Sequence, residues 1–405
     1  MDHANVASAV VTHYRRDRRD LPWRRTRDPY AIWVSEIMLQ QTRVATVIPY
    51  WERWMAKFPT VRALAAAPLD DVLAAWAGLG YYSRARNLHA GAQALAIAGE
   101  LPKSASELRA VRGIGPYTAG AIASIAYGER TPLVDGNVAR VLARLFAITD
   151  DIKSTAGQKL LWQRAGALMA ALPSDHAPGD LNQGLMELGA TLCSPTSPRC
   201  LLCPLAAQCE AARTGRQDEL PVVAARKKES ELPILARAAL WMADGDRVVL
   251  ARRAPDGLFG GLWELPQGAS RIEITKALGV TADATAVAYH DQTLSHRRLR
   301  IAVFRASVPR RLVATAVPGY DAISLVERAT AKALGIAAAT AAILSKYEDS
   351  PWSSIPKRSL SSPRATKRSS KASTTSGSTR ATTTSSTRRS ARRKGSTSSS
   401  TTRSK

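Results

Sequence analysis

The segment Leu108-Arg-Ala-Val-Arg-Gly113-Ile114-Gly115-Pro116-Tyr117-Thr118-Ala119 places two glycines between two stretches whose apolar residues recur at helical spacing. Glycine permits a tight turn and lets the backbone approach a neighbour closely, and Pro116 is a favoured residue for the first turn of a helix. The free N–H groups of that second helix would form a phosphate site that needs no particular base sequence. Gly-x-Gly alone is more typical of a plain turn between helices, but an acidic turn at Asp135 follows shortly after. The segment therefore predicts a DNA-binding helix–hairpin–helix.

The residues around this hairpin predict a helical domain. From residue 5 to about 192, proline- and glycine-containing breakers separate stretches in which apolar residues recur every three or four positions. These stretches are Ala31–Leu39, Val61–Ala66, Val72–Ala77, Leu88–Ile97, Ala119–Ala126, Val138–Ala147 and Leu160–Leu172.

Beyond a polar linker the pattern changes from helical to strand-like. The predicted strands are Arg237–Met242, Arg247–Ala251, Leu262–Leu265, Thr285–His290 and Leu299–Ala306, and helices are predicted near Ile272–Leu278 and Ala322–Leu334. We therefore expect a multidomain protein with an all-α domain at 1–212, a linker at 213–231, an α+β domain at 232–345 and a tail at 346–405.

The tail differs from the rest of the chain in composition. Residues 351–405 contain 14 Lys and Arg, no Asp or Glu, and 29 Ser and Thr, so they carry +14 of the net charge of +24. Such a segment buries too little apolar surface to offset its ordering entropy, and we predict that it is disordered. It is either a solubilising appendage or a tether for a polyanion such as DNA or RNA.

The chain contains no apolar run of membrane-spanning length and no recognisable signal peptide. We therefore expect a soluble protein of the cytoplasm.

Four cysteines, the only ones in the chain, lie in one short run: Cys193, Cys200, Cys203 and Cys209. The spacing C-x6-C-x2-C-x5-C supplies the four thiolates of an iron–sulfur cluster or of a structural zinc site. We favour the cluster, because zinc sites more often use paired C-x2-C knuckles and only one such pair is present. Two disulfides are the remaining alternative.

Two carboxylates stand out. Glu36 lies in an apolar stretch, Val34-Ser-Glu-Ile-Met-Leu39, where burial would raise its pKa towards that of a general acid; a half-exposed position at a helix edge is the plainer interpretation. Asp135 lies in Pro132-Leu-Val-Asp-Gly-Asn137, where it could cap the next helix, stabilise a cationic transition state, or do both.

Together, the hairpin, the Val134-Asp135-Gly136-Asn137 turn and the cysteine spacing resemble the endonuclease III superfamily of helix–hairpin–helix DNA glycosylases. Within it, Ser35-Glu36 before Met38-Leu39-Gln40-Gln41-Thr42 resembles the adenine DNA glycosylases (the MutY family), which remove adenine mispaired with 8-oxoguanine or guanine. Tyr117 stands where bifunctional relatives carry a lysine nucleophile, so the resemblance implies a monofunctional glycosylase that leaves an abasic site.

The resemblance also implies roles for individual residues. Glu36 would protonate the adenine, and Asp135, supported by Tyr117, would stabilise the oxocarbenium-like sugar, directly or through a transient adduct. The other implied sites are an adenine pocket of Arg19, Trp23, Arg24 and Gln183, DNA contacts by Gly113 and Gly115, and wedges of Leu39, Gln41 and either Tyr81, which we favour, or Tyr82. The four cysteines would hold a [4Fe–4S] cluster.

The strand-rich domain begins with Leu258-Phe-Gly-Gly-Leu-Trp-Glu-Leu-Pro266, which is similar to Nudix domains. The acidic metal-binding helix of Nudix hydrolases does not follow, so we do not expect pyrophosphatase activity. The resemblance to the adenine DNA glycosylases implies that this domain recognises 8-oxoguanine instead. Leu294-Ser295-His296 stands where the family has Phe-Ser-His, which leaves Ser295 and His296 as lesion contacts. The expected partner is double-stranded DNA with A·8-oxoG or A·G mispairs, bound by a monomer associated with a bacterial nucleoid.

Overall fold

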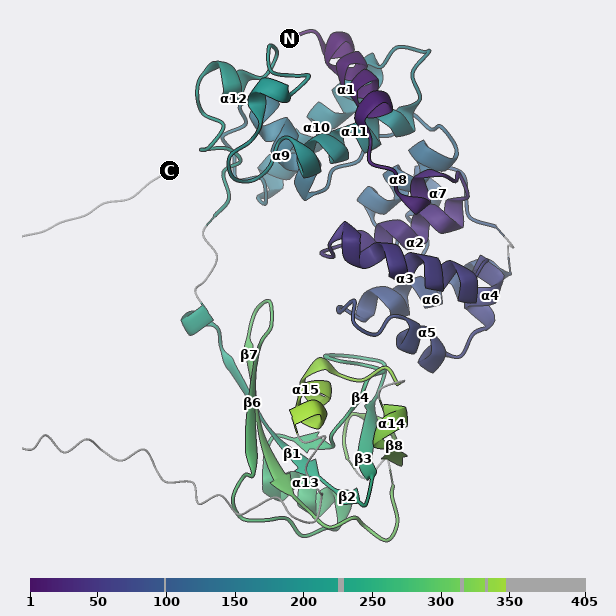
Figure 1. Ribbon diagram of the computed structural model, residues 1–405, viewed down its shortest axis with the longest axis vertical. Coiled ribbons are helices and arrows are strands. Elements are labelled where there is room, and N and C mark those ends of the chain that lie inside the picture. Colours follow the sequence, from purple (N-terminus) through teal and green to yellow (C-terminus); the bar gives the residue numbers. More distant parts are fainter. Residues whose placement is uncertain (98–99, 225–228, 314–316, 332–333, 347–405) are drawn as a thin grey trace, which may run out of the picture. The chain divides into compact units, whose positions relative to one another are not determined.

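The computed structural model describes residues 1–97, 100–224, 229–313, 317–331 and 334–346 (Figure 1). The predicted disordered tail from residue 347 and part of the predicted linker, 225–228, lie outside the described residues. The helical and the strand-rich parts are therefore described separately. None of the helices within the described residues combines the length and the apolar character that a membrane span requires.

The N-terminal part is helical, as predicted. Its α-helices are α1 (His3–Asp17), α2 (Pro29–Leu39), α3 (Val44–Lys57), α4 (Val61–Ala66), α5 (Leu69–Ala75), α6 (Ser83–Ala96), α7 (Ala105–Leu108), α8 (Pro116–Ala126), α9 (Gly136–Leu145), α10 (Thr155–Ala171), α11 (Pro178–Thr191) and α12 (Glu210–Arg213), with short 3-10 turns at Pro22–Arg24 and Cys200–Leu202.

The helical part has two hydrophobic cores. Trp33, Trp54 and Trp76 lie in the core of α2 to α8, whereas Val10 of α1 and Leu142 of α9 belong to the second core. Helix α1 reaches this second core by packing against α10 and α11, although more than a hundred residues separate them in sequence. Figure 1 shows α1 beside α10 and α11, with α2 to α8 forming the other lobe. Apolar periodicity did not single out α1 and α11, which pack against each other across the sequence, or α3, which packs against α2 and α5.

The predicted helix–hairpin–helix is formed by α7, the turn at residues 109–115 and α8. Helix α8 begins at Pro116, which confirms the prediction, and Gly115 precedes it as the N-terminal cap. Gly113 has φ of +88°, and a Cβ there would lie 2.9 Å from the Cβ of Asn87 on α6. This glycine is therefore required both by its left-handed backbone and by its close approach to α6.

The strand-rich part contains two sheets. Its elements are β1 (Ile234–Trp241), β2 (Ala243–Asp244), β3 (Arg247–Arg253), β4 (Trp263–Glu264), β5 (Gln267–Gly268), α13 (Arg271–Leu278), β6 (Ala288–Thr293), β7 (Arg298–Arg305), β8 (Tyr320–Glu327), α14 (Arg328–Ala331) and α15 (Ala338–Lys346), after a 3-10 turn at Glu229–Glu231. One sheet has the order β5-β1-β7-β6 and the other β2-β3-β4, with β8 paired to β3. β1 and β7 run parallel, whereas β3 and β8 are antiparallel.

One predicted element is wrong. The segment Ala322–Leu334 was expected to be helical, but residues up to Glu327 belong to β8, and only the short α14 follows. The segment pairs with β3 in a regular register, for example Val326 with Val248. Ladder hydrogen bonds to a distant strand therefore override a local apolar spacing that suits a helix. The helix near Ile272–Leu278 is confirmed as α13.

Candidate active site

Glu36 is a buried carboxylate within the most apolar stretch of α2. The residue is only 5% exposed, because it faces the protein on a helix whose neighbouring positions are also buried. Its Oε2 accepts a hydrogen bond from the hydroxyl of Tyr117. Burial raises the pKa of Glu36 to about 7, with a smaller contribution from the nearby Asp135 carboxylate, while the Tyr117 hydrogen bond opposes the rise. A carboxyl group with this pKa can hold and donate a proton near neutral pH.

Asp135 is the N-cap of α9. Its Oδ1 accepts the backbone N–H of Val138 at 2.7 Å, and its Oδ2 accepts the side-chain amide of Asn137 at 3.1 Å. Burial raises the pKa of Asp135 above its ordinary value, but both hydrogen bonds favour the charged form. The cap interpretation is therefore correct, and the same geometry leaves a hydrogen-bonded carboxylate near Glu36, so capping and catalysis are compatible.

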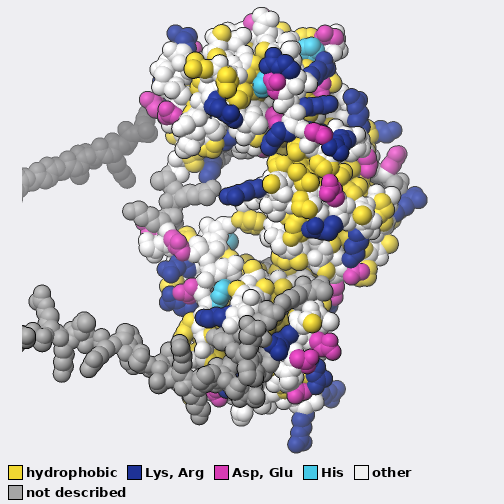
Figure 2. Space-filling model, viewed as in Figure 1, with side chains coloured by type: hydrophobic (Ala, Val, Ile, Leu, Met, Phe, Trp, Pro, Cys, Tyr) yellow, Lys and Arg dark blue, Asp and Glu magenta, His cyan; other side chains and the backbone are white. Residues whose placement is uncertain are grey.

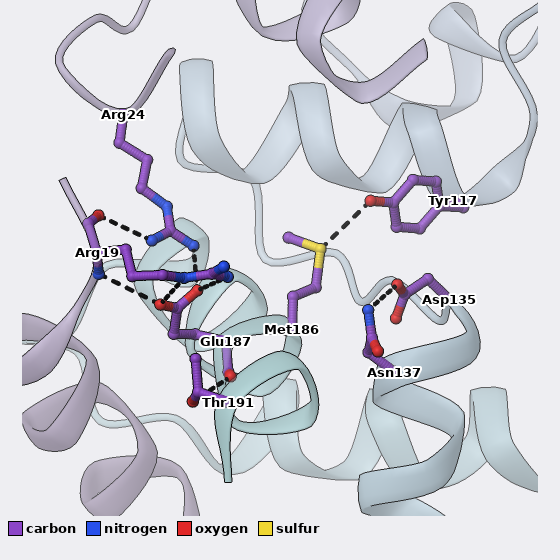
Figure 3. A network of polar contacts seen from close by, with 8 residues as sticks. All are labelled: Arg19, Arg24, Tyr117, Asp135, Asn137, Met186, Glu187 and Thr191. Atoms are coloured by element: carbon purple, nitrogen blue, oxygen red, sulfur yellow. Dashed lines mark hydrogen bonds and ion pairs between the residues drawn. The ribbon is translucent and has the colours of Figure 1, made fainter. Parts of the chain in front are cut away.

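Tyr117 joins the elements of this site. It is the second residue of α8, and its hydroxyl also lies 3.3 Å from the Sδ of Met186 on α11. Figure 3 shows Tyr117 pointing toward Met186, with Asp135 close by on the adjoining turn. Burial and the neighbouring Glu36 and Asp135 carboxylates raise the pKa of Tyr117 well above its ordinary value, so the phenol stays protonated and acts as a hydrogen-bond donor.

Glu187, on α11, was not selected from the sequence, yet it organises the neighbouring arginines. Its Oε1 lies 2.7 Å from the Nε of Arg19, and its Oε2 lies 2.8 Å from an Nη of Arg24 (Figure 3). Its side chain is 3% exposed and that of Arg24 is 9% exposed. Burial alone would raise the pKa of Glu187, but the two guanidinium groups outweigh it and lower the pKa to about 2. The only sequence signal was an acidic residue four positions after Gln183.

The residues predicted for the adenine pocket are only partly brought together. Arg19 and Arg24 meet at Glu187, and Arg24 is close enough to influence the pKa of Glu36. Trp23 is 6% exposed and packs edge-to-face against Trp51, with ring centroids 6.1 Å apart. In this structure Trp23 therefore packs within the core, and its predicted contact with the adenine stays a prediction.

Gln183 shares a cavity with Arg24, another residue of the predicted adenine pocket. It is half-buried on α11 and lines a cavity of about 90 Å³ together with Arg24, Arg27 and Ser124. Among the described residues that line this cavity, neither Glu36 nor Asp135 is included. Gln183 and Arg24 thus line one cavity, and their contact with an adenine stays a prediction.

The predicted wedge residues lie on two exposed turns. Gln41 follows the end of α2 and has φ of +56°, while Tyr81 precedes α6 and has φ of +48°. Tyr81 is 52% exposed, whereas Tyr82 and Leu39 are half-buried. Non-glycine residues rarely adopt positive φ, and such conformations concentrate at functional sites. The preference for Tyr81 over Tyr82 thus agrees with exposure, and its contact with DNA stays a prediction.

The four cysteines surround one small cavity of about 30 Å³, which Arg144 also lines. All four are free thiols, so the disulfide alternative does not hold. Burial raises the pKa of Cys203 to about 11 and also raises that of Cys209, and the neighbouring cysteines add to both shifts. A metal is what stabilises thiolates in such a setting. Within the described residues, no group of three or more His, Cys, Asp or Glu converges to hold a single metal ion.

A hydrogen-bonded chain links this cavity to Asp135. The Asn137 amide donates to Asp135, and the Nη2 of Arg140 donates to the Asn137 Oδ1 at 2.9 Å. The Nε of Arg140 donates to the Cys193 carbonyl at 2.7 Å. Arg144, which is 2% exposed, lies 3.3 Å from the Cys193 Sγ and also donates to backbone carbonyls of the loop. The loop therefore holds the start of α9 and its cap in place.

The arginines in and just after the cysteine loop are engaged by neighbouring acceptors. Arg213 pairs with Glu210, and Arg216 pairs with Glu219 at 2.8 Å. Arg199 is exposed and donates to the Thr191 carbonyl. On the face drawn in Figure 2, basic side chains are spread among acidic and neutral ones over the helical part. In the strand-rich part, Ser295 and His296 are exposed at the turn between β6 and β7.

Two family models match the chain. Residues 34–166 match the HhH-GPD superfamily of base excision DNA repair proteins, and residues 237–346 match the NUDIX domain. The first match contains Glu36, Tyr117 and Asp135, and the second contains Ser295 and His296. These matches confirm the predicted combination of a helix–hairpin–helix domain and a Nudix-like domain.

Curated relatives are adenine DNA glycosylases. The human protein is 40% identical over 311 residues, which cover 64% of this chain and 56% of the relative. The protein of Buchnera aphidicola subsp. Baizongia pistaciae is 35% identical over 255 residues, which cover 62% of this chain and 70% of the relative. A solved thermostable thymine-DNA glycosylase is 27% identical, with 53% of this chain and 97% of that chain covered and a TM-score of 0.48. The chain spans about half the length of several relatives, including 47% of the Arabidopsis thaliana protein.

Proposed function

Because the chain belongs to the adenine DNA glycosylase family, we propose that it removes adenine from A·8-oxoG and A·G mispairs in double-stranded DNA by hydrolysing the N-glycosidic bond. The observation that carries this proposal is the buried Glu36 carboxyl, whose pKa of about 7 lies close to neutral pH and which contacts Tyr117 beside Asp135. The protein acts as a monomer on DNA of the bacterial nucleoid.

The first step is extrusion of the adenine from the base stack, since no side chain can reach its glycosidic bond inside the duplex. Gln41 and Tyr81 enter the space that the base leaves, with Leu39 beside them, while Gly113 and Gly115 of the hairpin hold the phosphate backbone. The exposure and left-handed backbone of Gln41 and Tyr81 at two neighbouring turns support this role. Arg24 and Arg19, held by Glu187, shape the adenine pocket.

The chemical step divides between two carboxyl groups. Glu36, protonated, donates its proton to the adenine and so makes the base a better leaving group. Asp135, whose charged form accepts hydrogen bonds from the Val138 N–H and the Asn137 amide, stabilises the positive charge that develops on the sugar. Water then completes hydrolysis. This is the division of labour of glycoside hydrolysis, in which environment sets one carboxyl group as acid and the other as anion.

Strand cleavage is not expected to follow. Tyr117 offers a phenol that stays protonated and lacks the amine that Schiff-base chemistry requires. The product is therefore an abasic site in an unbroken strand.

The four cysteines would hold a [4Fe–4S] cluster. The four thiol groups that line one cavity, next to the buried Arg144 guanidinium, support this proposal, because four thiolates are the ligand set of such a cluster. When bound, such a cluster cross-links residues 193–209 through metal–thiolate bonds. The chain's own contribution is to transmit that rigidity through Arg140 and Asn137 to Asp135.

The Nudix-like domain reads the base opposite the adenine, through Ser295 and His296 at the exposed β6–β7 turn. Its candidate metal-binding helix, α13, carries Glu273 as its sole acidic residue. Hydrolysis of a nucleoside diphosphate by this domain is therefore not proposed.

The test is a glycosylase assay on duplexes containing A·8-oxoG, A·G or T·G, each with and without alkali treatment. We expect breakage of the adenine strand after alkali and none without it. Release of thymine from T·G, or strand breakage without alkali, would contradict the proposal. Glu36→Gln serves as the unreactive control, and Asp291→Asn, an exposed carboxylate paired with Arg300 in the strand-rich part, serves as the matched conservative control.

A further inference from the structure

Arg84, in the first turn of α6, donates hydrogen bonds to two separate loops. Its Nη1 contacts the carbonyl oxygens at the end of α2, and its Nη2 contacts both the turn that follows and the turn before α6. The acceptors are the carbonyls of Ile37 at 2.8 Å, Met38 at 3.0 Å and Gln40, the Thr42 Oγ1 at 3.3 Å, and the carbonyls of Leu79 at 3.0 Å and Gly80 at 3.2 Å.

These two loops carry Gln41 and Tyr81, which combine a strained backbone with an exposed side chain. Gln41 and Tyr81 both have positive φ and are both exposed. A residue in such a conformation keeps it only where the surrounding contacts impose it. The six acceptors of Arg84 lie within four residues of one or the other, and its guanidinium also lies 5.6 Å from the centre of the Tyr81 ring. One side chain thus holds both conformations.

The guanidinium of Arg84 is well suited to bind several carbonyl groups at once. The carbonyls of Ile37 and Met38 belong to the last turn of α2, which has no intrahelical donors left and carries the negative end of the helix dipole. The planar fork of a guanidinium can serve several carbonyls at once, whereas a lysine ammonium has a single nitrogen. Burial lowers the pKa of Arg84 to about 10, so the group still carries its charge at neutral pH.

We propose that Arg84 is a positioning residue that fixes the Gln41 turn and the Tyr81 turn as one rigid unit, so that extrusion of the adenine from the duplex depends on it. This inference rests on the proposed function, because it assigns both turns to the DNA. Arg84 does not take part in bond breaking, and its effect is confined to unstacking and to the positioning of the extruded base.

The test separates unstacking from chemistry. In a Glu36→Gln background, which is unreactive, the protein is bound to an A·8-oxoG duplex that carries 2-aminopurine next to the adenine. We expect the fluorescence increase on binding to fall by more than half when Arg84→Met is added. In the otherwise native protein, the same change is expected to lower the single-turnover excision rate about 10- to 100-fold, the effect of misplacing reacting groups by about 1 Å.

Two further variants control the result. Arg130→Met removes another arginine that donates to carbonyls, those of Met169, Ala170 and Leu172 at the end of α10. It is expected to leave fluorescence and rate within about threefold of the parent, since it touches neither turn. Arg84→Lys keeps the charge but not the fork, so we expect only partial recovery; it also carries the test if Arg84→Met does not fold.

The proposal is overturned if both Arg84 variants match the parent in fluorescence and rate, or if Arg130→Met loses as much as Arg84→Met. Failure of the proposed function has a different signature. In that case the parent protein itself releases no adenine, while the fluorescence comparison between the unreactive proteins still reports on Arg84.

Discussion

At the scale of single residues, the burial of Glu36 lowers the stability of the protein at neutral pH but supplies a proton for the reaction. The carboxyl group is buried on α2 with a pKa of about 7, so the native state holds its proton more tightly than the unfolded chain, in which a glutamate titrates near its ordinary value of about 4.3. Stability linked to this group is therefore greatest at low pH and falls as pH rises from about 4 to about 7. The protein tolerates a group that is costly to ionise in return for a proton available near neutral pH.

Replacing Glu36 by Gln tests both the effect on the excision rate and the effect on the free energy of unfolding. We expect excision to fall by orders of magnitude, because the amide has no acidic proton to donate. At pH 8 we expect the variant to be more stable than the parent by about 1–3 kcal/mol, since it avoids a buried charge, with a much smaller difference near pH 4. Denaturant unfolding of the parent and the variant at both pH values measures this difference in stability. An equal difference at pH 4 and pH 8 would contradict the raised pKa.

The pKa of Glu36 also predicts how activity depends on pH. In the parent, the single-turnover rate should fall as pH rises above about 7, because Glu36 then loses the proton that it donates.

Glu187 is also buried, but its pKa is lowered rather than raised, because two arginines contact it. Its low pKa of about 2 means that its contribution to stability is fully present above about pH 5 and is lost as pH falls toward 2. Glu187→Ala leaves the buried Arg24 without a counter-charge, and we expect a loss of about 3–5 kcal/mol in unfolding free energy at pH 7.

Asp180→Asn is the matched control for Glu187. Asp180 also lies on α11 and pairs with Arg15 at 2.8 Å, but that arginine side chain is 47% exposed. We expect a cost below about 1 kcal/mol, because exposed ion pairs contribute little. Equal losses in the two variants, measured by urea unfolding, would show that the Glu187 network is no stronger than a surface pair.

At the scale of elements, α9 combines a structural and a chemical function in one side chain. Asp135 caps the helix through the Val138 N–H, and the same carboxylate lies close enough to Glu36 and Tyr117 to raise the pKa of both. Helix capping explains why an aspartate is stable here, and it helps to orient the carboxylate. The chain through Asn137 and Arg140 then anchors this end of α9 to the cysteine loop.

Two substitutions separate these functions of Asp135. Asn is as good an N-cap as Asp, so we expect Asp135→Asn to change the unfolding free energy by less than about 1 kcal/mol while it greatly lowers the excision rate. Asp135→Ala loses the cap as well, and we expect it to cost about 1–2 kcal/mol. Thermal unfolding and single-turnover kinetics check the pair; an active Asp135→Asn protein would leave Asp135 as a cap alone.

At the scale of the whole molecule, charge is distributed unevenly. The tail at 351–405 carries +14 without any acidic residue, whereas several arginines of the helical part are engaged by glutamates or aspartates. Cationic charge without nearby acidic residues in the sequence is therefore concentrated in the tail.

We expect the tail to strengthen DNA binding without affecting the chemical step. Removing residues 351–405 should weaken binding to any duplex and flatten the dependence of log Kd on log salt by about 0.9 for each phosphate that the tail neutralises. The single-turnover rate at saturating protein should stay unchanged. Fluorescence anisotropy at several salt concentrations measures the slope, with a tail in which every Lys and Arg is Gln as the control; an unchanged slope would leave the tail as a solubilising appendage.

How much of the molecule was predictable differs from feature to feature. The hairpin and the cap at Asp135 follow from local spacing, because glycine geometry and helix capping act over a few residues. The strand at Tyr320–Glu327 was mistaken for a helix because its structure is determined by β3, about 70 residues away.

By itself, the sequence determined the two-domain composition, the turn that begins α8, and the set of carboxyl and thiol groups available for chemistry. Only the tertiary structure decided what those groups can do. Burial beside Tyr117 gives Glu36 a pKa near neutral pH, Glu187 engages the arginines that the sequence left free, and Arg84 joins two turns about 40 residues apart in the sequence. The physical reason is that desolvation, ion pairing and shared hydrogen bonds depend on distances in space, which local spacing does not specify.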